Sequence, residues 1–411
     1  MNKLWSVSYI CKDVWNILNE ERRNAKTNYY KQKKRLTDLK AQDERFSIPS
    51  SQVLQEVVKS LNTSWKMFFT KRKNGDKEVR PPRFKSYKYF FTQKYPQREK
   101  SFKIENNILY LAYGKRPADW IKVELPDGSY SEVKTVTIFY DKVQKKWYAS
   151  LTYYVPEKEY IGDKKAIYFD PGCKTTLTGI KTDLTLWEYD INPLRELNLK
   201  HYKLIDTLKS KRDKKKKGSK AWRRLNSKIR KLYRKINTQT KHYLHKLANK
   251  ILEDHPDVSY FGIGSWNKKQ TLADTGIAFV DKYINRQVQN NNPVMTLIKY
   301  LNYKAKLSGR KVEKFDEANT TRTCSKCGYV LTGGLFPSQR VFNCPKCGFA
   351  IERDVNSTLN FLKIHQYALW QGLRDMTALS IARISLSPSS GKNRKVLKRT
   401  LILNYQDARC L

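Results

Sequence analysis

The spacing of hydrophobic residues divides the chain into a helical beginning, a strand-rich middle and a longer mixed remainder. Apolar residues recur every three to four positions within residues 2–42 and again within residues 53–68, which predicts helices. Between about residues 84 and 156 the period changes to two, and turn residues separate five short alternating runs. Short strands at this spacing predict a small β-barrel.

The remainder alternates strands with helices, so the chain is expected to be an α+β protein of several domains. An apolar strand ends in Asp170, and residues 175–178 suit a strand that returns after the turn at Pro171-Gly172. Further helices are predicted at about 198–253, 293–307 and 355–364, and further strands near 258–264 and 312–317.

Two local features refine this order. Asn292 before Pro293 is typical of a helix start, so we expect Asn292 to be the N-cap of the helix at 293–307. The segment after about residue 365 is basic, and we expect it to be peripheral or partly disordered.

Composition narrows the class of partner. The 411 residues include 82 Lys and Arg against 38 Asp and Glu, a net charge of +44, and so basic a chain needs a polyanion such as nucleic acid. The 26 Tyr, 16 Phe and 9 Trp could stack on unpaired bases, although core packing explains most of them equally well. No apolar run is long enough for a membrane span, the first residues lack the apolar core of a signal peptide, and Cys11, Cys173 and Cys410 are isolated. An intracellular, reducing location is therefore expected.

The clearest chemical signal is a pair of Cys-x-x-Cys motifs. Cys324 and Cys327 form the first, and Cys344 and Cys347 follow after sixteen residues, which is the spacing of a four-thiolate zinc site. A glycine follows each motif, where such a turn often needs a positive φ. Because four sulfurs leave no position open for water, we expect one structural Zn²⁺. Four free or disulfide-bonded cysteines are the alternative.

Carboxylates stand on both flanks of this predicted zinc module. Glu317 ends the strand before it, and Asp354 follows it directly. A closed module would bring its flanks together, and carboxylates that meet favour Mg²⁺, which prefers oxygen ligands. Asp170 at its strand end suits the same role, although an aspartate that forms a turn before Pro-Gly is as common. Each acid taken alone is also typical of a solvated surface charge.

The helical region at 198–253 carries nearly continuous positive charge. Lysines crowd residues 211–217, and Arg223, Arg224 and Lys228 continue the charge beside an apolar face. A solvated surface helix is the alternative. Because unrelieved positive charge repels itself, we expect this region to contact nucleic-acid phosphates.

From about residue 8 to residue 364 the sequence resembles the TnpB family. These are RNA-guided nucleases of insertion sequences, long described as transposases and related to the Fanzor proteins and to compact type V CRISPR effectors. The segments that carry the resemblance are PPRFKSYK at 81–88, YFDPG at 168–172, TTRTCSKCG at 320–328, CPKCG at 344–348 and RDVN at 353–356. They are specific in combination.

The resemblance implies a helical recognition lobe, a wedge β-barrel and a ribonuclease-H-like RuvC domain that contains an inserted zinc module. On this chain the implied boundaries are 1–83 for the recognition lobe, 84–160 for the wedge barrel, 161–320 for the RuvC domain with the basic insertion at 198–253, 321–350 for the zinc module, 351–364 for the last RuvC segment and 365–411 for a tail. The chain begins without the family's first wedge strand, which is expected to weaken the barrel or its guide contacts.

The resemblance also implies RuvC chemistry, in which carboxylates hold two Mg²⁺ ions that cut DNA. Asp170 matches the first aspartate of the family and Asp354 the last. The usual glutamate after the strand at 258–264 is replaced by Gly262, and some members without that acid are guided DNA-binding repressors. Another branch, which includes Fanzors, carries the glutamate where Glu317 stands. We therefore expect Asp170, Glu317 and Asp354 to form the catalytic site.

Members of the family act with a guide RNA on double-stranded DNA beside a short flanking motif, so both nucleic acids are expected partners. Gln can pair with adenine edges, and Lys and Tyr can hold phosphate or stack, so polar side chains near residues 51–55 and 85–93 are candidates for reading that motif. These candidates are Ser51, Gln52, Gln55, Lys85, Tyr89, Thr92 and Gln93. They could equally belong to the ordinary surface of the barrel.

The leading hypothesis is a metal-dependent, RNA-guided DNA endonuclease. A nuclease-dead, RNA-guided DNA-binding repressor is the main alternative, followed by an unguided zinc-dependent nucleic-acid-binding protein and a DNA transposase. The expected location is the cytoplasm or nucleoid of a prokaryote, or the nucleus if the host is a eukaryote or its virus.

Overall fold

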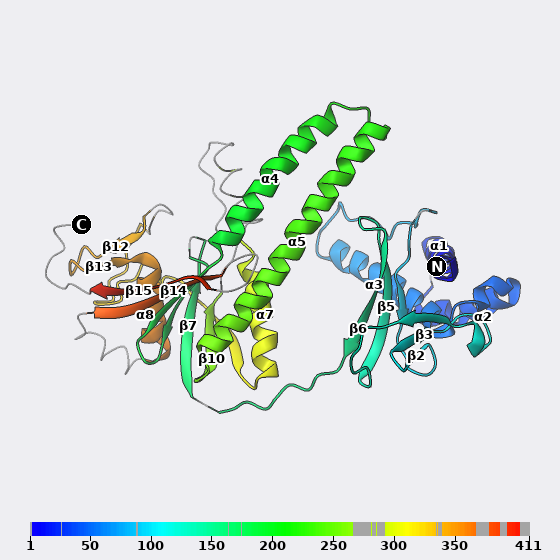
Figure 1. Cartoon of the computed structure of the whole chain (residues 1–411). Helices are drawn as coiled ribbons and strands as arrows, with labels where there is room; N and C mark the ends of the chain where they lie inside the picture. Colours follow the sequence, from blue (N-terminus) through cyan, green and yellow to red (C-terminus); the bar gives the residue numbers. More distant parts are fainter. Residues whose placement is uncertain are drawn as a thin grey trace. The chain divides into compact units, whose positions relative to one another are not determined.

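The computed structural model describes residues 2–265, 281, 285, 292–366, 378–386 and 393–402, apart from residues 26, 88, 163, 174, 334 and 336–338. The chain separates into two compact units, Met1–Val155 and Pro156–Leu411 (Figure 1). Across the described residues, we find no helix with a stretch apolar enough to cross a bilayer.

Helices begin the first unit, as the periodicity predicts. They are α1 (Asn2–Asn24), α2 (Tyr29–Gln42), the short 3₁₀ helix Glu44–Ser47 and α3 (Ser51–Lys73). The apolar positions Val53, Val57 and Leu61 of α3 are buried in a core that the helices share with the following strands. The helix predictions are therefore confirmed.

The strands of the first unit form two antiparallel sheets of three strands each. One sheet has the order β1-β5-β6, from β1 (Gln93–Tyr95), β5 (Val133–Asp141) and β6 (Lys146–Tyr153). The other has the order β2-β3-β4, from β2 (Phe102–Glu105), β3 (Ile108–Leu111) and β4 (Ile121–Glu124), with the 3₁₀ helix Pro117–Asp119 before β4. Among the described residues of this unit no ladder joins the two sheets, so the strands are confirmed but do not form one closed hydrogen-bonded barrel.

A seven-stranded sheet organises the second unit, in the order β11-β10-β7-β8-β9-β14-β15. An antiparallel meander consists of β7 (Lys165–Pro171), β8 (Leu177–Lys181) and β9 (Leu186–Asp190). On the other side of β7 lie β10 (Val258–Gly264) and β11 (Lys311–Phe315), both parallel to it. Because β7, β10 and β11 run in the same direction, their carboxyl ends meet at one edge of the sheet.

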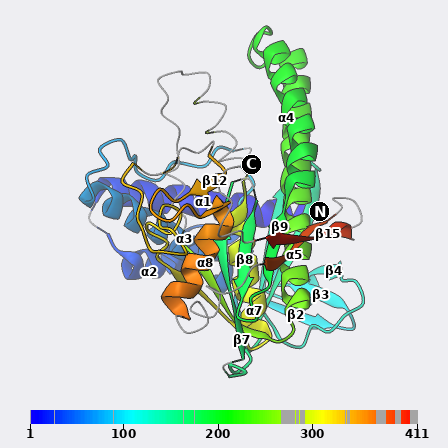
Figure 2. The same ribbon diagram turned by 90° about the vertical axis from the view of Figure 1, so that its left-hand side faces the viewer.

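Helices pack on both faces of this sheet. α4 (Asn192–Asp213) and α5 (Lys220–Asp254) form a hairpin that extends away from the sheet (Figures 1 and 2), and the base of α5 packs with α7 (Val294–Leu307) on one face. The opposite face carries α8 (Arg353–His365) and a small antiparallel pair, β12 (Val341–Asn343) and β13 (Ala350–Glu352).

The two-residue period of β7 assigns its side chains to these layers. Ile167 and Phe169 pack in the core beneath α5 and α7, whereas Ala166 and Tyr168 pack on the α8 side. By the same alternation, Asp170 belongs to the α8 side.

The start of α7 differs from the expectation. Pro293 is the N-cap, and the predicted cap, Asn292, instead donates its side-chain amide to the Gly172 carbonyl at 3.0 Å. Asn292 thus holds the turn that follows Asp170 and Pro171, and this long-range contact has no signature in the local sequence.

The described residues 378–386 and 393–402 also differ from the expected peripheral tail. β14 (Ala378–Leu386) pairs in parallel with β9 and antiparallel with β15 (Asn393–Ile402). Ile381, Ile384 and Leu386 are 1%, 3% and 1% exposed and lie in the two sheet cores. The basic residues of this segment hid a short alternating apolar pattern that a sheet edge can bury.

We expect Ile384→Ala to destabilise the second unit by about 2–5 kcal/mol, because it leaves a cavity in a closed core. Thermal unfolding of the purified protein measures this. The matched control is Ile364→Ala on α8, where the side chain is 59% exposed and the expected change is within about 0.5 kcal/mol. Equal unfolding temperatures for the two variants would show that β14 does not close the core.

Candidate metal centres and nucleic-acid surfaces

Two similar turns present the four cysteines. Gly328 and Gly348 have φ of 76° and 68°, the left-handed conformation that the sequence predicts after each pair. Each glycine donates its amide to the carbonyl of the first cysteine of its pair, Gly328 to Cys324 at 2.9 Å and Gly348 to Cys344 at 3.0 Å. The repeated geometry turns both thiols of each pair inward.

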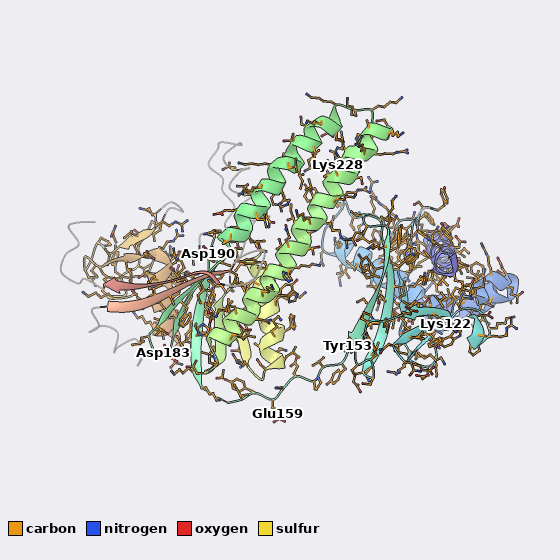
Figure 3. The ribbon with its side chains drawn as sticks, in the orientation of Figure 1. Lys122, Tyr153, Glu159, Asp183, Asp190 and Lys228 are labelled. Carbon is orange, nitrogen blue, oxygen red and sulfur yellow. The ribbon has the colours of Figure 1, made fainter. Side chains whose placement is uncertain are left out.

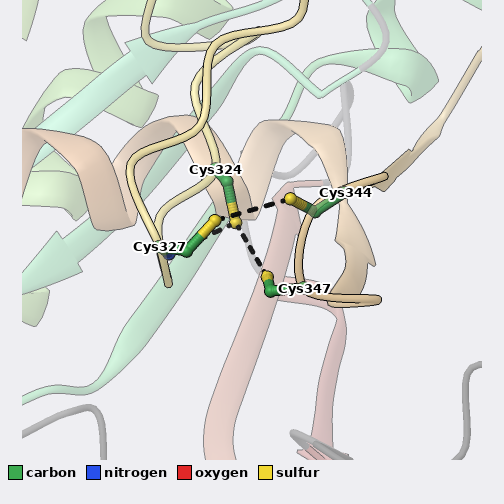
Figure 4. A group of neighbouring side chains, drawn as sticks. All are labelled: Cys324, Cys327, Cys344 and Cys347. Atoms are coloured by element: carbon green, nitrogen blue, oxygen red, sulfur yellow. Dashed lines mark hydrogen bonds between the residues drawn. The ribbon is translucent and has the colours of Figure 1, made fainter.

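The four sulfurs converge on one point (Figure 4). The Sγ atoms of Cys324 and Cys347 are 3.8 Å apart, and those of Cys327 and Cys344 are 3.5 Å apart. Such separations fit a tetrahedral ion bound at about 2.3 Å, and burial raises the pKa of the Cys324 thiol, which therefore needs a cation to ionise. In the part of the chain that is described, this is the only group of three or more possible ligands whose atoms all lie within 4.8 Å of one another. The cluster can hold one zinc ion.

The three predicted carboxylates come from three elements on the same side of the sheet. Asp170 is the penultimate residue of β7, Glu317 lies two residues beyond β11, and Asp354 is in the first turn of α8. The carboxyl ends of β7 and β11 share one edge of the sheet, and α8 covers the face to which Asp170 points. The structure therefore brings together residues that are 147 and 37 positions apart in the sequence.

Their electrostatics show how close these groups are. Burial, then the negative charge of Asp354 and then that of Glu317, raise the pKa of Asp170 well above its usual range, against a Ser357 hydrogen bond and the Arg353 charge. Burial and the neighbouring Asp316 raise the pKa of Glu317 to about 7. The oxygens of the three carboxylates do not all lie within 4.8 Å of one another, as the four sulfur atoms do.

One oxygen of Glu317 has the character of an unused ligand atom. Its Oε2 is buried and accepts no hydrogen bond from a described group. A buried carboxylate oxygen without a donor is costly, and a hard divalent cation would satisfy it. The donor set and this unpaired oxygen together fit Mg²⁺.

Aromatic side chains fill the space beside Gly262. A Cβ on Gly262 would lie 2.6 Å from Cδ1 of Tyr168 and 3.1 Å from Cε1 of Phe315. The two rings fill the space, so the chain has no room for a glutamate at that position.

Buried polar side chains of α8 join the carboxylates to the cysteine module. The Asn360 side chain donates to the carbonyls of Thr320 and Thr323 at 2.8 and 2.7 Å. Asn356 donates to the Thr323 carbonyl at 2.8 Å and accepts from the Ser325 amide at 3.0 Å. These contacts tie the segment after Glu317 to the helix that carries Asp354.

A pair of hydroxyl groups adds to this connection. Ser357 lies 3.0 Å from the Thr320 hydroxyl, which also donates to the Glu317 carbonyl at 2.8 Å. Sequence reasoning missed Asn356, Ser357 and Asn360. Their signal was available, because they are polar residues at helical spacing on a face that the apolar pattern assigns to the core.

The basic hairpin leaves its predicted phosphate contacts open to solvent. Arg223, Arg224 and Lys228 are all exposed on the outer part of α5, where Figure 3 labels Lys228. The two helices hold together through a narrow apolar seam of Ile205, Ile229 and Ile236. The hairpin thus presents positive charge on a scaffold with its own small core.

The predicted readers on α3 lie beside basic hollows of the first unit. Ser51 and Gln55 line one hollow together with Lys33, Lys34 and Lys40, and Gln52 and Gln55 line a second together with Lys59 and Lys66. Lys40 donates to the Ser51 hydroxyl at 2.7 Å, and Ser50 donates to the Gln52 side chain at 2.8 Å.

The loop before β1 presents some of the predicted readers, whereas Gln93, the first residue of β1, is buried. Lys85 lies over the rings of Trp15 and Tyr89, at 4.5 and 4.9 Å from their centroids, and Tyr89 and Thr92 are exposed. Gln93 is only 1% exposed; it donates to the Leu4 carbonyl at 2.7 Å and accepts from Tyr95 at 2.9 Å. Gln93 is therefore a core residue and not a reader, because both ends of its amide are used inside the fold.

Two family matches cover the second unit. Residues 156–268 match the family described as "Probable transposase" (OrfB_IS605), and residues 295–361 match "Cas12f1-like, TNB domain". A "TnpB-like protein" of Acanthamoeba polyphaga mimivirus is 25% identical over 233 residues, which is 56% of this chain and 43% of that protein. The chain is therefore similar to TnpB-like proteins and, in its second unit, to these two families. It matches less than half the length of that viral relative.

Longer similarity comes from a bacterial protein and a solved structure. A Streptomyces pristinaespiralis protein named "Putative RNA-guided DNA endonuclease" is 27% identical over 350 residues, which is 84% of this chain and 78% of that protein. The protein in a structure titled "Cryo-EM structure of the Cas12f1-sgRNA-target DNA complex" matches 87% of this chain and 81% of its own, with a TM-score of 0.59 at 15% identity. At this identity the structural match concerns the fold alone, which is an α+β fold resembling Cas12f1.

We expect Cys324→Ser to remove the metal from the four-cysteine cluster and to lower the unfolding temperature of the second unit, since three ligands hold zinc less tightly than four. Metal analysis of the purified protein should find one zinc per chain, and much less in the variant. Cys173→Ser is the matched control, because Cys173 is exposed and outside the cluster. Well-folded protein without zinc would contradict the assignment.

Proposed function

We propose that this chain is an RNA-guided DNA endonuclease in which Asp170, Glu317 and Asp354 hold two catalytic Mg²⁺ ions. The observation that carries the proposal is the meeting of three carboxylates from β7, the end of β11 and α8, close enough that two of them raise the pKa of the third. Perturbed acids gathered at one sheet edge are typical of catalytic sites. The name of the bacterial relative supports the same activity.

The strand order supports a RuvC-type domain. The order β9-β8-β7-β10-β11, with an antiparallel meander followed by two parallel strands, is that of the ribonuclease-H-like fold that the family resemblance implies. In such a sheet the central strand and its parallel neighbours end at the same edge. An acid that leaves either parallel strand can therefore reach the acid on β7.

Each carboxylate has a distinct support in this chain. Ser357 donates to Asp170 and so orients its carboxylate. Asp354 lies in the first turn of α8, where the helix N-terminus favours negative charge. Glu317 offers an oxygen that has no hydrogen-bond donor among the described residues. When bound, two Mg²⁺ ions would supply an activated water and stabilise the leaving 3′ oxygen of the cut strand.

The four-cysteine cluster has a structural role in this proposal. A zinc bound by four thiolates has no open position, so it would hold the module closed and take no part in the cleavage. Closure matters because Glu317 and Asp354 stand on the two sides of the module.

The remaining surfaces would hold the nucleic acids. The exposed charges of the α4/α5 hairpin suit the phosphates of a guide RNA or its duplex with DNA. Ser51, Gln52, Gln55, Lys85, Tyr89 and Thr92 suit the flanking motif of target DNA, with amides for base edges and basic residues nearby.

We expect the purified ribonucleoprotein to cut DNA that matches its guide in the presence of Mg²⁺. Asp170→Asn and Glu317→Gln should each lower the cleavage rate by more than about a hundredfold, because loss of mere supporting groups around a metal already costs about 10–100-fold. Gel analysis of target cleavage measures the rate.

The controls separate the possible failures. Glu313→Gln removes an exposed acid within β11, four residues before Glu317, and should leave the cleavage rate unchanged. A complex that binds its target but does not cut it would identify a guided repressor. If it cuts and Glu317→Gln cuts equally well, the assignment of Glu317 is wrong.

We expect replacement of Arg223, Arg224 and Lys228 by Gln to weaken RNA binding and to flatten its salt dependence, by about one unit of slope for each phosphate that no longer has a cationic partner. Binding measured across a series of salt concentrations gives the slope of log affinity against log salt. An unchanged slope would remove the hairpin from the nucleic-acid interface.

A further inference from the structure

Gly264, the last residue of β10, lies directly beneath the Glu317 carboxylate. A Cβ on Gly264 would overlap with Oε2 of Glu317 and would stand 3.1 Å from its Cδ and 3.3 Å from Cδ of Pro171. The carboxylate therefore occupies the volume that a side chain at position 264 would fill. The other residue near this volume is Pro171, which follows Asp170.

The strand register explains why the carboxylate arrives at this place. Gly264 pairs with Phe315 at the end of the β10/β11 ladder, and the Ser265 amide makes a last bond to the Phe315 carbonyl at 2.8 Å. Glu317 leaves β11 two residues later, and the Thr320 hydroxyl holds its carbonyl. With its backbone held in this way, the side chain reaches back over the end of β10.

The backbone gives no other reason for a glycine at this position. The φ of Gly264 lies outside the left-handed region, so an L-residue can adopt the conformation. Glycine inside a strand is less favourable than alanine, because it loses more conformational freedom on folding. Among the described residues, the closest atom to such a Cβ belongs to the Glu317 carboxylate, and it is the atom that the Cβ would overlap.

We propose that Gly264 is a positioning residue for the metal site: the absence of its side chain forms the seat that directs the Glu317 carboxylate toward Asp170. The inference rests on the proposed function, since it assigns a role to the ligand Glu317. It adds that position 264 at the end of β10, two residues after Gly262, is where this chain accommodates an acid delivered from β11.

The test measures Mn²⁺, as a substitute for Mg²⁺, binding to the purified full chain by electron paramagnetic resonance, so it does not depend on cleavage. Gly264→Ala should weaken Mn²⁺ affinity by about ten- to a hundredfold, as for other residues that orient metal ligands. Gly262→Ala is the matched control. It adds the same methyl group to the same strand, against Tyr168 and Phe315, and should lower the unfolding temperature while leaving Mn²⁺ affinity within about twofold.

A second pair of variants tests whether the carboxylate is the cause. In a Glu317→Ala background, Gly264→Ala should leave the unfolding temperature unchanged or raise it, because the overlap is gone. Glu317→Asp, one methylene shorter, should recover part of the Mn²⁺ affinity that Gly264→Ala removes. If Gly264→Ala fails to fold, folding of the Gly264→Ala/Glu317→Ala protein still supports the seat, and failure of both overturns it.

The outcomes separate this inference from the proposal beneath it. If Glu317→Ala alone leaves Mn²⁺ affinity unchanged, Glu317 is not a ligand and both ideas are wrong. If Glu317→Ala no longer binds the metal while Gly264→Ala binds it as the unmodified chain does, only the seat is wrong. Equally weakened Mn²⁺ binding in Gly262→Ala and Gly264→Ala would mean that strand distortion is the cause, which also overturns the inference.

Discussion

The buried side-chain amides of α8 determine where the candidate site residues of the second unit lie. Asn356 and Asn360 bond the backbone of the segment that leaves β11, and the same helix carries Asp354 in its first turn. Buried amides must find partners, so these contacts resist separation more than apolar packing alone would. The cysteine cluster closes the other end of the connection. Helix α8 and the four-cysteine module therefore hold Glu317 and Asp354 near Asp170 on the central strand.

This arrangement has an electrostatic cost in the absence of cations. A carboxylate with a raised pKa contributes nothing below its unfolded pKa, and it opposes folding increasingly as the pH rises toward its folded value. For Glu317 that range extends from its ordinary pKa near 4.5 to about 7. Asp170 adds to the cost in the same direction. In the proposed function a bound divalent cation would offset this repulsion, and it would therefore stabilise the fold.

Much of the fold follows from periodicity, and its exceptions have physical causes. The helices and strands of the first unit, the strands β7, β8, β10 and β11 and the turns at Gly328 and Gly348 are local features that the sequence predicts correctly. The predictions that Asn292 caps a helix and that Gln93 reads the flanking motif do not agree with the structure. The side-chain amides of these residues bond instead to Gly172 and Leu4, which are distant in the sequence. The strand β14 was not predicted, because the basic composition of its segment was given more weight than its alternating apolar residues.

The candidate site was predictable in its members but not in its construction. The spacing of the cysteines and the positions of Asp170, Glu317 and Asp354 are visible in the sequence. The space above Gly264 that Glu317 fills is not visible, because a glycine in a strand has no local meaning until a carboxylate from the segment after the neighbouring strand is found above it. Residue types predict ligands, whereas the space between them is a property of the folded sheet.

The separate core of the α4/α5 hairpin makes its length an independent variable. The seam of Ile205, Ile229 and Ile236 is distinct from the cores of the sheet, and the hairpin turns at Gly218 with a φ of 86°. Removing two helical turns from each arm would shorten the reach of its positive charge by about 11 Å, at 1.5 Å per residue, without displacing any of the three carboxylates. A change in the length of the hairpin would therefore alter the reach of its positive charge and keep the arrangement of the three carboxylates.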